Sequence, residues 1–449
     1  MQASASPGAW RTALLPAAVL ILAGVLLAAY ALSAAVWLDR PFLGAFFQRD
    51  LTVGAADSLV RDRWPARDAG LRSGDRVLTL DDEDLSALPV PERLNALYDR
   101  LDSYNTGEAV TVRFLRRSGD APVGAECSIT AQDERVCSLA LRLGTLPLGD
   151  LAAYFAPGWL TGWLVWLAGV ILLARRPANS SVRSGALVAA TWAVSMAGQF
   201  EALSAGPLAW TWPLGLALAG AALGMLALEF PYRPALLLQT PALRLAPWLA
   251  GLAAGVSAVA LSRADDPALN RLGTGIGLGV LLIAGLLLLS MLLGRRRRIT
   301  SPLARNQSGL LVSGLLPALL PFGVWLAALV VNGEGIPALA VPNGILPALL
   351  PLSLFLALTQ ARLLDADRLA ARAILYGALI ALLSLSYFLL VAGLALWLGR
   401  SATELAVSPA LLVMAVFAVT LAFNPLRDAL QQRIDAVYFR KRQTYQPVL

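Results

Sequence analysis

The chain has 449 residues, of which 57% are hydrophobic and only 14% are charged, and its formal net charge is +7. This composition excludes an ordinary soluble globular protein. The sequence also contains no histidine, which excludes a histidine phosphoacceptor, a His-Glu-x-x-His zinc protease and a Ser-His-Asp protease. We therefore expect a membrane protein with no catalytic residues, no metal site and no cofactor.

Apolar stretches of roughly 20 residues recur along the chain, and each is long enough to cross about 30 Å of hydrocarbon. The first stretch follows Arg11 and is too long for the apolar region of a usual signal peptide, so we interpret it as a membrane anchor. Together the stretches predict about ten transmembrane helices, at 13–37, 155–174, 184–203, 208–228, 246–262, 273–294, 309–331, 336–359, 373–398 and 408–424.

The distribution of Lys and Arg among the loops predicts the orientation of these helices. With a cytoplasmic N-terminus, nineteen basic residues lie in cytoplasmic segments, and the short loops on the other side hold only Arg263, Arg271 and Arg400. Both termini are therefore expected in the cytoplasm, and residues 39–149 outside it. Because that segment has 14 basic and 18 acidic residues, the positive charge belongs to the membrane part and does not indicate nucleic-acid binding.

Residues 39–149 are enough for one small domain. Their pattern predicts a strand, a helix, a strand, a helix and a strand, followed by a hairpin that carries the cysteines. A short helix over Ala66–Leu71 is ended by Gly70, and Gly74-Asp75 then turns the chain into a strand over Arg76–Leu80.

An amphipathic helix over Glu92–Leu101 and an alternating strand over Ala109–Leu115 complete the pattern. In this order the elements resemble a bacterial PDZ domain, over about Phe42–Ser118. The resemblance implies a small α+β fold that binds peptide ends. It also implies a carboxylate-binding loop with bare backbone amides, formed by Leu43, Gly44, Ala45 and Phe46. The alternative is that these four residues only lead the chain out of the membrane, with aromatic side chains at the interface.

The two cysteines of the chain, Cys127 and Cys137, both lie in the segment expected outside the cytoplasm. A separation of ten residues in that environment favours a disulfide that closes a hairpin. Two free thiols are the alternative.

Few polar residues fall within the predicted spans. Glu201, near the outer end of the third span, is a functional candidate because carboxylates within membranes are rare; alternatively, it reaches the interface. No series of acidic residues crosses several helices, as in many ion-coupled transporters, and no phosphate-binding glycine loop is present. Arg295–Arg298 are interpreted as a topology anchor, with contact to anionic lipid headgroups as the alternative.

The last residues of the chain form an amphipathic pattern, since apolar side chains recur three or four positions apart at Leu426, Leu430, Ile434 and Val437. This stripe favours a signalling helix that leaves the membrane and dimerises. The alternative is a helix that lies on the inner leaflet.

Three motifs, Ser301–Gln307, Leu356–Tyr376 and Asn424–Arg440, resemble the membrane sensor region of bacterial histidine kinases of the quorum-sensing and competence type. Those kinases also carry a PDZ-like segment after their first span. The chain departs from their pattern at Thr444-Tyr445, where the family usually has Asp-Tyr. The resemblance implies a sensor, and we expect either that its kinase is a separate chain or that the sequence is a truncated or degenerate gene product.

We therefore expect a polytopic α-helical protein of the cell membrane with a small α+β PDZ-like extracytoplasmic domain. It would bind an external peptide, a protein or a lipid-soluble signal and pass the signal to a separate histidine kinase, with membrane lipid and a second copy of the chain as further partners. The alternative is a transporter-like or assembly-scaffold protein whose domain recruits an external partner. The expected parts are a cytoplasmic stub with the first helix (1–38), the PDZ-like domain (39–149), about nine helices (150–424) and a cytoplasmic amphipathic or signalling helix (425–449).

Overall fold

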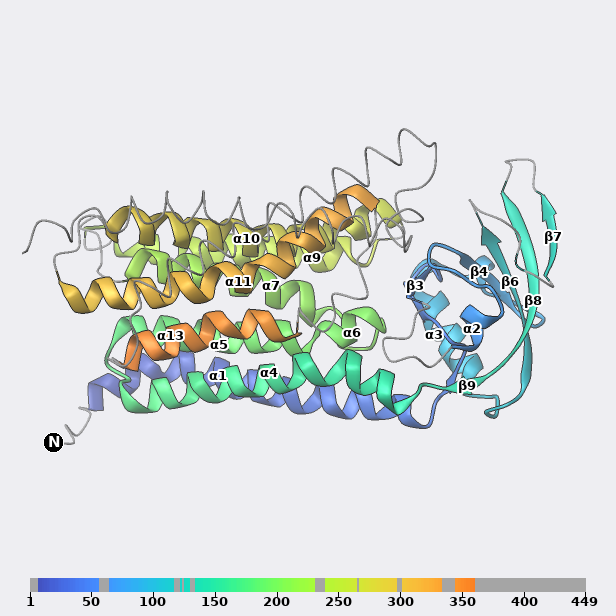
Figure 1. Ribbon diagram of the computed structural model, residues 1–449, viewed down its shortest axis with the longest axis horizontal. Helices are drawn as coiled ribbons and strands as arrows, with labels where there is room; N and C mark the ends of the chain where they lie inside the picture. Colours follow the sequence, from blue (N-terminus) through green and yellow to red (C-terminus); the bar gives the residue numbers. More distant parts are fainter. Residues whose placement is uncertain are drawn as a thin grey trace, which may run out of the picture.

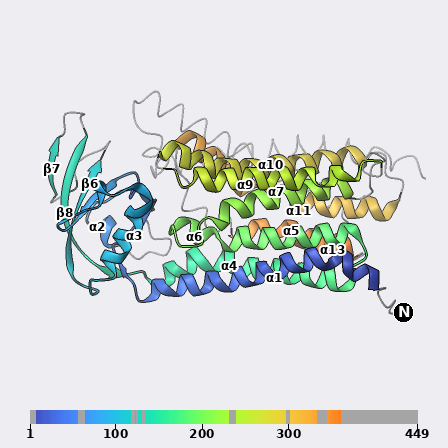
Figure 2. The ribbon, with the colours of Figure 1, turned by 180° about the vertical axis from the view of Figure 1, so that it is seen from behind.

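The computed structural model describes residues 7–55, 64–116, 122, 125–129, 134–230, 239–264, 266–296, 301–332 and 344–359. Within these residues, long helices form a bundle, and a smaller α/β domain lies at one end of it (Figure 1). The view from behind shows the same arrangement (Figure 2). The first described helix, which begins at Pro7, starts at the end of the bundle that is far from the domain.

Six helices in the described part of the chain are long and apolar enough to cross a membrane. This confirms the prediction of a multi-pass helical membrane protein, without fixing the number of spans. The helices of the bundle are α1 (Pro7–Ala35), α4 (Leu148–Arg175), α5 (Ser180–Ala197), α6 (Gln199–Leu203), α7 (Thr211–Glu229), α9 (Ala246–Leu261), α10 (Pro267–Arg296), α11 (Pro302–Asn332) and α13 (Leu349–Thr359), with short 3₁₀ turns at Val36–Leu38, Pro241–Arg244 and Leu346–Ala348.

The span predicted at 184–203 is divided between two helices, since α5 ends at Ala197 and the five-residue α6 follows Gly198. At its other end, α5 begins where the Asn179 side chain accepts hydrogen bonds from two backbone N–H groups. Of the span predicted at 336–359, residues 344–359 are described. The spans predicted at 373–398 and 408–424, and the tail 425–449, lie outside the described residues.

Helix α5 occupies the middle of the bundle, and every residue from Ser184 to Ala197 is buried. Glycines on α4 let the two backbones approach closely: a Cβ at Gly162 would lie 3.0 Å from Ala193 O, and one at Gly169 would lie 2.7 Å from Ala189 Cβ. Small residues at such contacts are typical of helix packing in membranes, where close van der Waals contact drives association.

The domain lies between α1 and α4 in the chain and is built around an antiparallel five-stranded sheet with strand order β5-β4-β6-β8-β7. Two small ladders, β1–β9 and β2–β3, lie beside this sheet. The elements of the domain are β1 (Pro41–Phe42), β2 (Phe46–Phe47), β3 (Val53–Ala55), α2 (Pro65–Asp68), β4 (Arg76–Leu80), β5 (Glu83–Asp84), α3 (Val90–Leu101), β6 (Ala109–Arg116), β7 (Glu126–Ile129), β8 (Arg135–Arg142) and β9 (Gly144–Thr145), with a 3₁₀ turn at Leu85–Ala87.

The sequence patterns account for these elements. Strand β4 has the predicted bounds, and β6 alternates buried and exposed residues along most of its length. In α3 the apolar positions Leu94, Leu97 and Leu101 are all buried. The chain enters the domain at Pro41 and leaves it at Thr145, and these two residues pair in the β1–β9 ladder. The connections to α1 and α4 are therefore held together where the domain meets the bundle.

Candidate functional site

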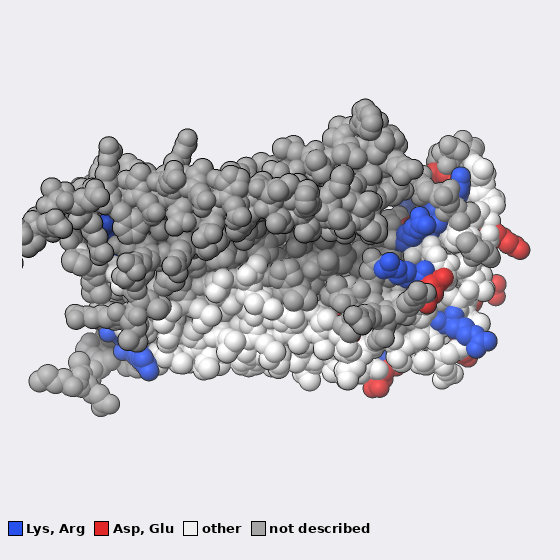
Figure 3. Space-filling model, in the orientation of Figure 1, with Lys and Arg blue, Asp and Glu red and all other residues white. Residues whose placement is uncertain are grey.

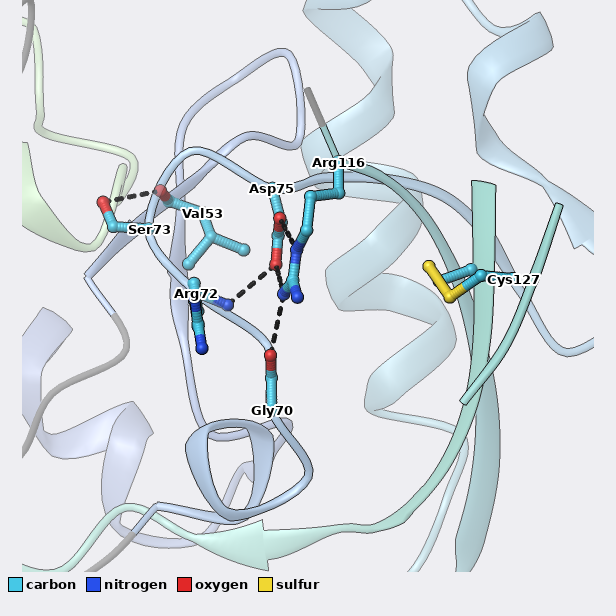
Figure 4. A network of polar contacts seen from close by, with 8 residues as sticks. Val53, Gly70, Arg72, Ser73, Asp75, Arg116 and Cys127 are labelled. Atoms are coloured by element: carbon cyan, nitrogen blue, oxygen red, sulfur yellow. Dashed lines mark hydrogen bonds and ion pairs between the residues drawn. A yellow bond between two sulfur atoms is a disulfide. The ribbon is translucent and has the colours of Figure 1, made fainter. Parts of the chain in front are cut away.

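The Gly74-Asp75 turn, which the sequence analysis singles out, is part of a buried ionic network (Figure 4). Asp75 is 3% exposed and accepts hydrogen bonds from Arg116 Nε at 2.9 Å and Nη2 at 2.6 Å. It also accepts the backbone N–H of Arg72, and Arg116 donates to Gly70 O, both at 2.8 Å. Gly70 and Gly74 have φ of +96° and +88°, which glycine adopts without steric cost. This Asp75–Arg116 brace joins the turn before β4 to the end of β6, and its charged groups face one another rather than solvent.

The four residues of the predicted peptide-binding loop lie in the interior. Leu43, Ala45 and Phe46 are 1%, 2% and 0% exposed. Gly44 has φ +91°, and a Cβ at this position would lie 2.8 Å from Pro65 N, so the loop packs directly on the start of α2. A peptide carboxylate could reach the amides of this loop only after the surrounding contacts open.

Cys127 and Cys137 form a disulfide. They stand directly opposite one another on β7 and β8, and their Cα atoms are 4.1 Å apart. Cys137 is fully buried, whereas all four residues of β7 are exposed. The disulfide therefore fastens the outermost strand of the sheet to the strand that carries part of the core.

An aromatic cluster joins the domain to the bundle. Trp37, just after α1, makes edge-to-face contacts with Phe46 of β2, with Tyr98 of α3 and with Phe200 of α6, at ring-centroid distances of 5.2, 5.7 and 6.4 Å. Phe46 also contacts Phe200 directly, at 5.9 Å. Edge-to-face pairs of this kind stabilise a contact beyond their buried area. We call Trp37, Phe46, Tyr98 and Phe200 the docking cluster.

The aromatic contacts continue from the docking cluster to α4. Phe46 contacts Trp64, at the start of α2, and Tyr154 of α4 at 5.5 and 5.8 Å. The Trp64 indole N–H donates to Asp150 Oδ2 at 2.8 Å, and both residues are fully buried. A carboxylate at the first turn of α4 also interacts favourably with the helix dipole. The domain and the bundle thus share one continuous core where they meet.

Polar contacts accompany the docking cluster. The Tyr98 hydroxyl donates to the backbone O of Ser204, in the turn after α6, at 3.1 Å. Arg40 forms two hydrogen bonds of 2.8 Å to Asp102, and its guanidinium lies 4.9 Å from the Tyr98 ring centroid. Burial raises the pKa of the Tyr98 phenol above its ordinary value of 10.0, which extends the pH range in which the hydroxyl is a donor.

Glu201 of α6 is 1% exposed, and its carboxylate is hydrogen-bonded to another part of the chain. Its carboxylate accepts the backbone N–H of Leu208 at 3.0 Å. Beside it, the hydroxyls of Tyr30 and Thr211 are 2.6 Å apart and link α1 to α7. Glu201 therefore holds the α6–α7 turn in place.

The described residues contain no group of three or more Cys, Asp or Glu side chains that could hold a metal ion. No family model matches the chain, and no curated protein or solved structure is detectably similar to it. The function therefore has to be argued from the structure itself. The residues that join the domain to the bundle are the strongest candidates for function, and the sequence patterns pointed to Phe46 and Glu201 among them. Trp37, Tyr98 and Phe200 look like ordinary interfacial or core aromatics until their partners are known.

Proposed function

We propose that the chain is a membrane sensor. Its α/β domain lies outside the cytoplasm, binds a peptide or a lipid-soluble signal, and passes a conformational change through the bundle to a kinase-type output on another chain. The observation that supports this function best is the continuous core shared by the domain with α1, α4 and α6, through contacts such as Phe46–Phe200 and Phe46–Tyr154.

The shared core makes the domain a poor candidate for a freely swinging recruitment module. Interdigitated aromatic side chains transmit a displacement because a packed interior has little free volume. A rearrangement of the domain would therefore move Phe200 and Tyr154, and with them α6 and α4. Packed interfaces of this kind change between discrete arrangements rather than continuously, as a switch requires.

The charge distribution supports an external domain. Figure 3 shows that, on the face in view, charged side chains of the described residues gather over the domain and at the opposite end of the bundle, while the described surface between them shows none. The far end carries Arg175 and Arg295, at the ends of α4 and α10, and Arg183 in the first turn of α5. Under the positive-inside rule this end faces the cytoplasm, and the domain faces the other side.

The proposed function also includes the ligand loop and the output helix. The PDZ-like interpretation assigns the peptide end to Leu43–Phe46, which would become available on opening of the domain. The tail 425–449, outside the described residues, would carry the signal as a dimeric helix. Cysteines introduced at Leu430 or Ile434 should cross-link two copies, and a uniformly monomeric product would contradict this part of the proposal.

The test follows the distance between the domain and the bundle in the full chain, reconstituted in nanodiscs. Fluorophores are attached at cysteines introduced at Asn95 of α3 and at Asp266 in the α9–α10 loop, both exposed. The probes are a library of short peptides with free carboxylates, the same peptides with amidated ends, and a lipid extract. We expect a subset of the carboxylate peptides, or a lipid fraction, to change the distance.

Two outcomes would contradict the sensor function. If no probe changes the distance, the domain does not receive these signals. If a probe binds and the distance stays the same, the domain serves recruitment, as in an assembly scaffold. A substitution that blocks the predicted loop, such as Gly44→Glu, is unsuitable as a control, because a side chain at Gly44 would collide with the start of α2. The amidated peptides serve as the control instead.

A further inference from the structure

The turn between α6 and α7, Ser204–Leu208, lies against the domain. Its first residue accepts the hydrogen bond from Tyr98, and Leu203 and Ala205 pack on the core of the domain. Phe200, one helical turn earlier, belongs to the docking cluster. One short segment of the bundle thus supplies both an aromatic side chain and a carbonyl acceptor to the domain.

The surface that this segment covers lies between β2 and α3. Trp37 contacts Phe46 of β2 and Tyr98 of α3 at the same time, so it lies between the two elements. Phe200 contacts Trp37 and Phe46, and the carbonyl of Ser204 reaches Tyr98. A face with one phenolic donor and several aromatic rings suits a peptide segment that carries an aromatic side chain and a free carbonyl.

The turn is held in a conformation with a backbone cost. Ala205 has φ +48°, in the left-handed region that L-residues rarely adopt. Hydrogen bonds on either side keep it there: Gly206 N donates to Glu201 O at 2.9 Å, Leu208 N donates to the Glu201 carboxylate, and Ser204 Oγ donates to Phe200 O at 2.9 Å. These hydrogen bonds therefore offset the backbone cost of the closed position of the turn.

We propose that Ser204–Leu208 is a latch. In the closed state the latch and Phe200 occupy the face between β2 and α3; in the open state this face binds an external peptide of the same chemistry, with an aromatic side chain followed by a carbonyl acceptor. The latch rests on the proposed sensor function, because it names the ligand class and the step by which binding reaches α6 and α7.

The test measures binding of a labelled peptide with the sequence of Gly198–Leu208, GQFEALSAGPL, to the full chain in nanodiscs by fluorescence anisotropy. The same peptide with alanine at the Phe200 position serves as its control. Two substitutions at Ala205 shift the backbone preference of the latch in opposite directions. Ala205→Val disfavours the left-handed conformation and should strengthen peptide binding about tenfold, whereas Ala205→Gly should weaken it about fivefold.

The same substitutions at Ala209, which is not among the residues with positive φ, provide the matched control and should change the affinity less than about twofold. If Ala205→Val does not fold, Ala205→Gly still tests the latch, because glycine adopts the positive φ of this position without strain and the variant should fold. Equal binding by wild type and Ala205→Gly, or no binding by any variant, would overturn the latch.

Failure of the latch is distinguishable from failure of the sensor function. If external peptides change the Asn95–Asp266 distance while the Ala205 variants behave alike, the latch is wrong and the sensor stands. If the Ala205 variants differ as expected and no external probe changes that distance, the face opens but does not serve as the input of a sensor.

Discussion

Two buried networks of this protein, the Asp75–Arg116 brace and the docking cluster, differ in what they connect. The brace is ionic and joins two parts of one domain, over a sequence separation of 41 residues. The docking cluster is aromatic and joins the domain to the bundle; its polar contact, Tyr98 to Ser204, spans 106 residues. The network with the recognisable sequence motif lies within the domain, and the network without a motif connects the domain to the bundle, where the proposed signal would pass. Substitutions in the two should therefore have separable effects.

The largest effect is expected from Arg116→Met. It leaves the Asp75 carboxylate buried without its cation, and breaking a buried pair in this way costs about 3–5 kcal/mol. Amide hydrogen exchange across β4 and β6 should rise throughout, in line with unfolding of the whole domain.

Arg113→Met is the matched control, because Arg113 lies on the same strand with an exposed side chain, and a change below about 0.5 kcal/mol is expected there. The double variant Asp75→Leu/Arg116→Met should recover part of the lost stability, since it removes both charges. Similar losses for Arg113 and Arg116 would show that the brace has no special role.

Phe200→Ala should release the domain without unfolding it. Removal of a buried phenylalanine side chain costs about 3–5 kcal/mol, and Phe200 is 1% exposed. Hydrogen exchange should increase in β2, α3 and α6 but not in β6 and β8. Leu160→Ala on α4, where the side chain is 54% exposed, should leave both regions unchanged. Faster exchange in β6 and β8 after Phe200→Ala would mean that the two networks are not separable.

Loss of the disulfide should affect only the region of the domain farthest from the bundle. A cross-link that closes a loop of about ten residues is worth about 2–3 kcal/mol. The variant Cys127→Ser/Cys137→Ser should show faster exchange in β7 and β8, and the Asn95–Asp266 distance should not change. A change in that distance would place the disulfide on the path between domain and bundle.

Sequence patterns predicted the local structure well where a few neighbouring residues decide it. Strand Arg76–Leu80 follows from its Gly-Asp turn, and the helix ending at Leu101 follows from its apolar spacing. The membrane helices follow from hydropathy, because a segment that crosses the bilayer has to be apolar and has to satisfy its own backbone hydrogen bonds. Among the site residues, the pairing of Cys127 with Cys137 could be predicted, because it requires only that the short segment between them forms a hairpin.

The candidate site could not be predicted in the same way, since it depends on contacts between distant segments. Burial of Leu43–Phe46 results from contacts with α2 and α6, and the sequence near residue 43 contains no pattern that predicts those contacts. The hydrogen bond between Trp64 and Asp150 spans 86 residues. Glu201 was noticed because it is acidic in an apolar stretch, but its role in the α6–α7 turn becomes visible only from its contact with Leu208.

The smallest effect is expected from Tyr98→Phe, which keeps the ring in the docking cluster and removes only the hydroxyl. One hydrogen bond to a backbone carbonyl is worth about 1 kcal/mol, so domain opening should increase about fivefold, measured by exchange in α3. In wild type, burial raises the pKa of Tyr98 above 10.0, and the closed state therefore favours the neutral phenol. Its contribution is fully present below pH 10 and decreases as the pH rises above that value, because the open form then loses its proton more readily. Wild type should accordingly open more above pH 10 than at neutral pH, and the difference between wild type and Tyr98→Phe should shrink there. Identical pH profiles for the two proteins would show that the hydroxyl does not hold the domain on the bundle.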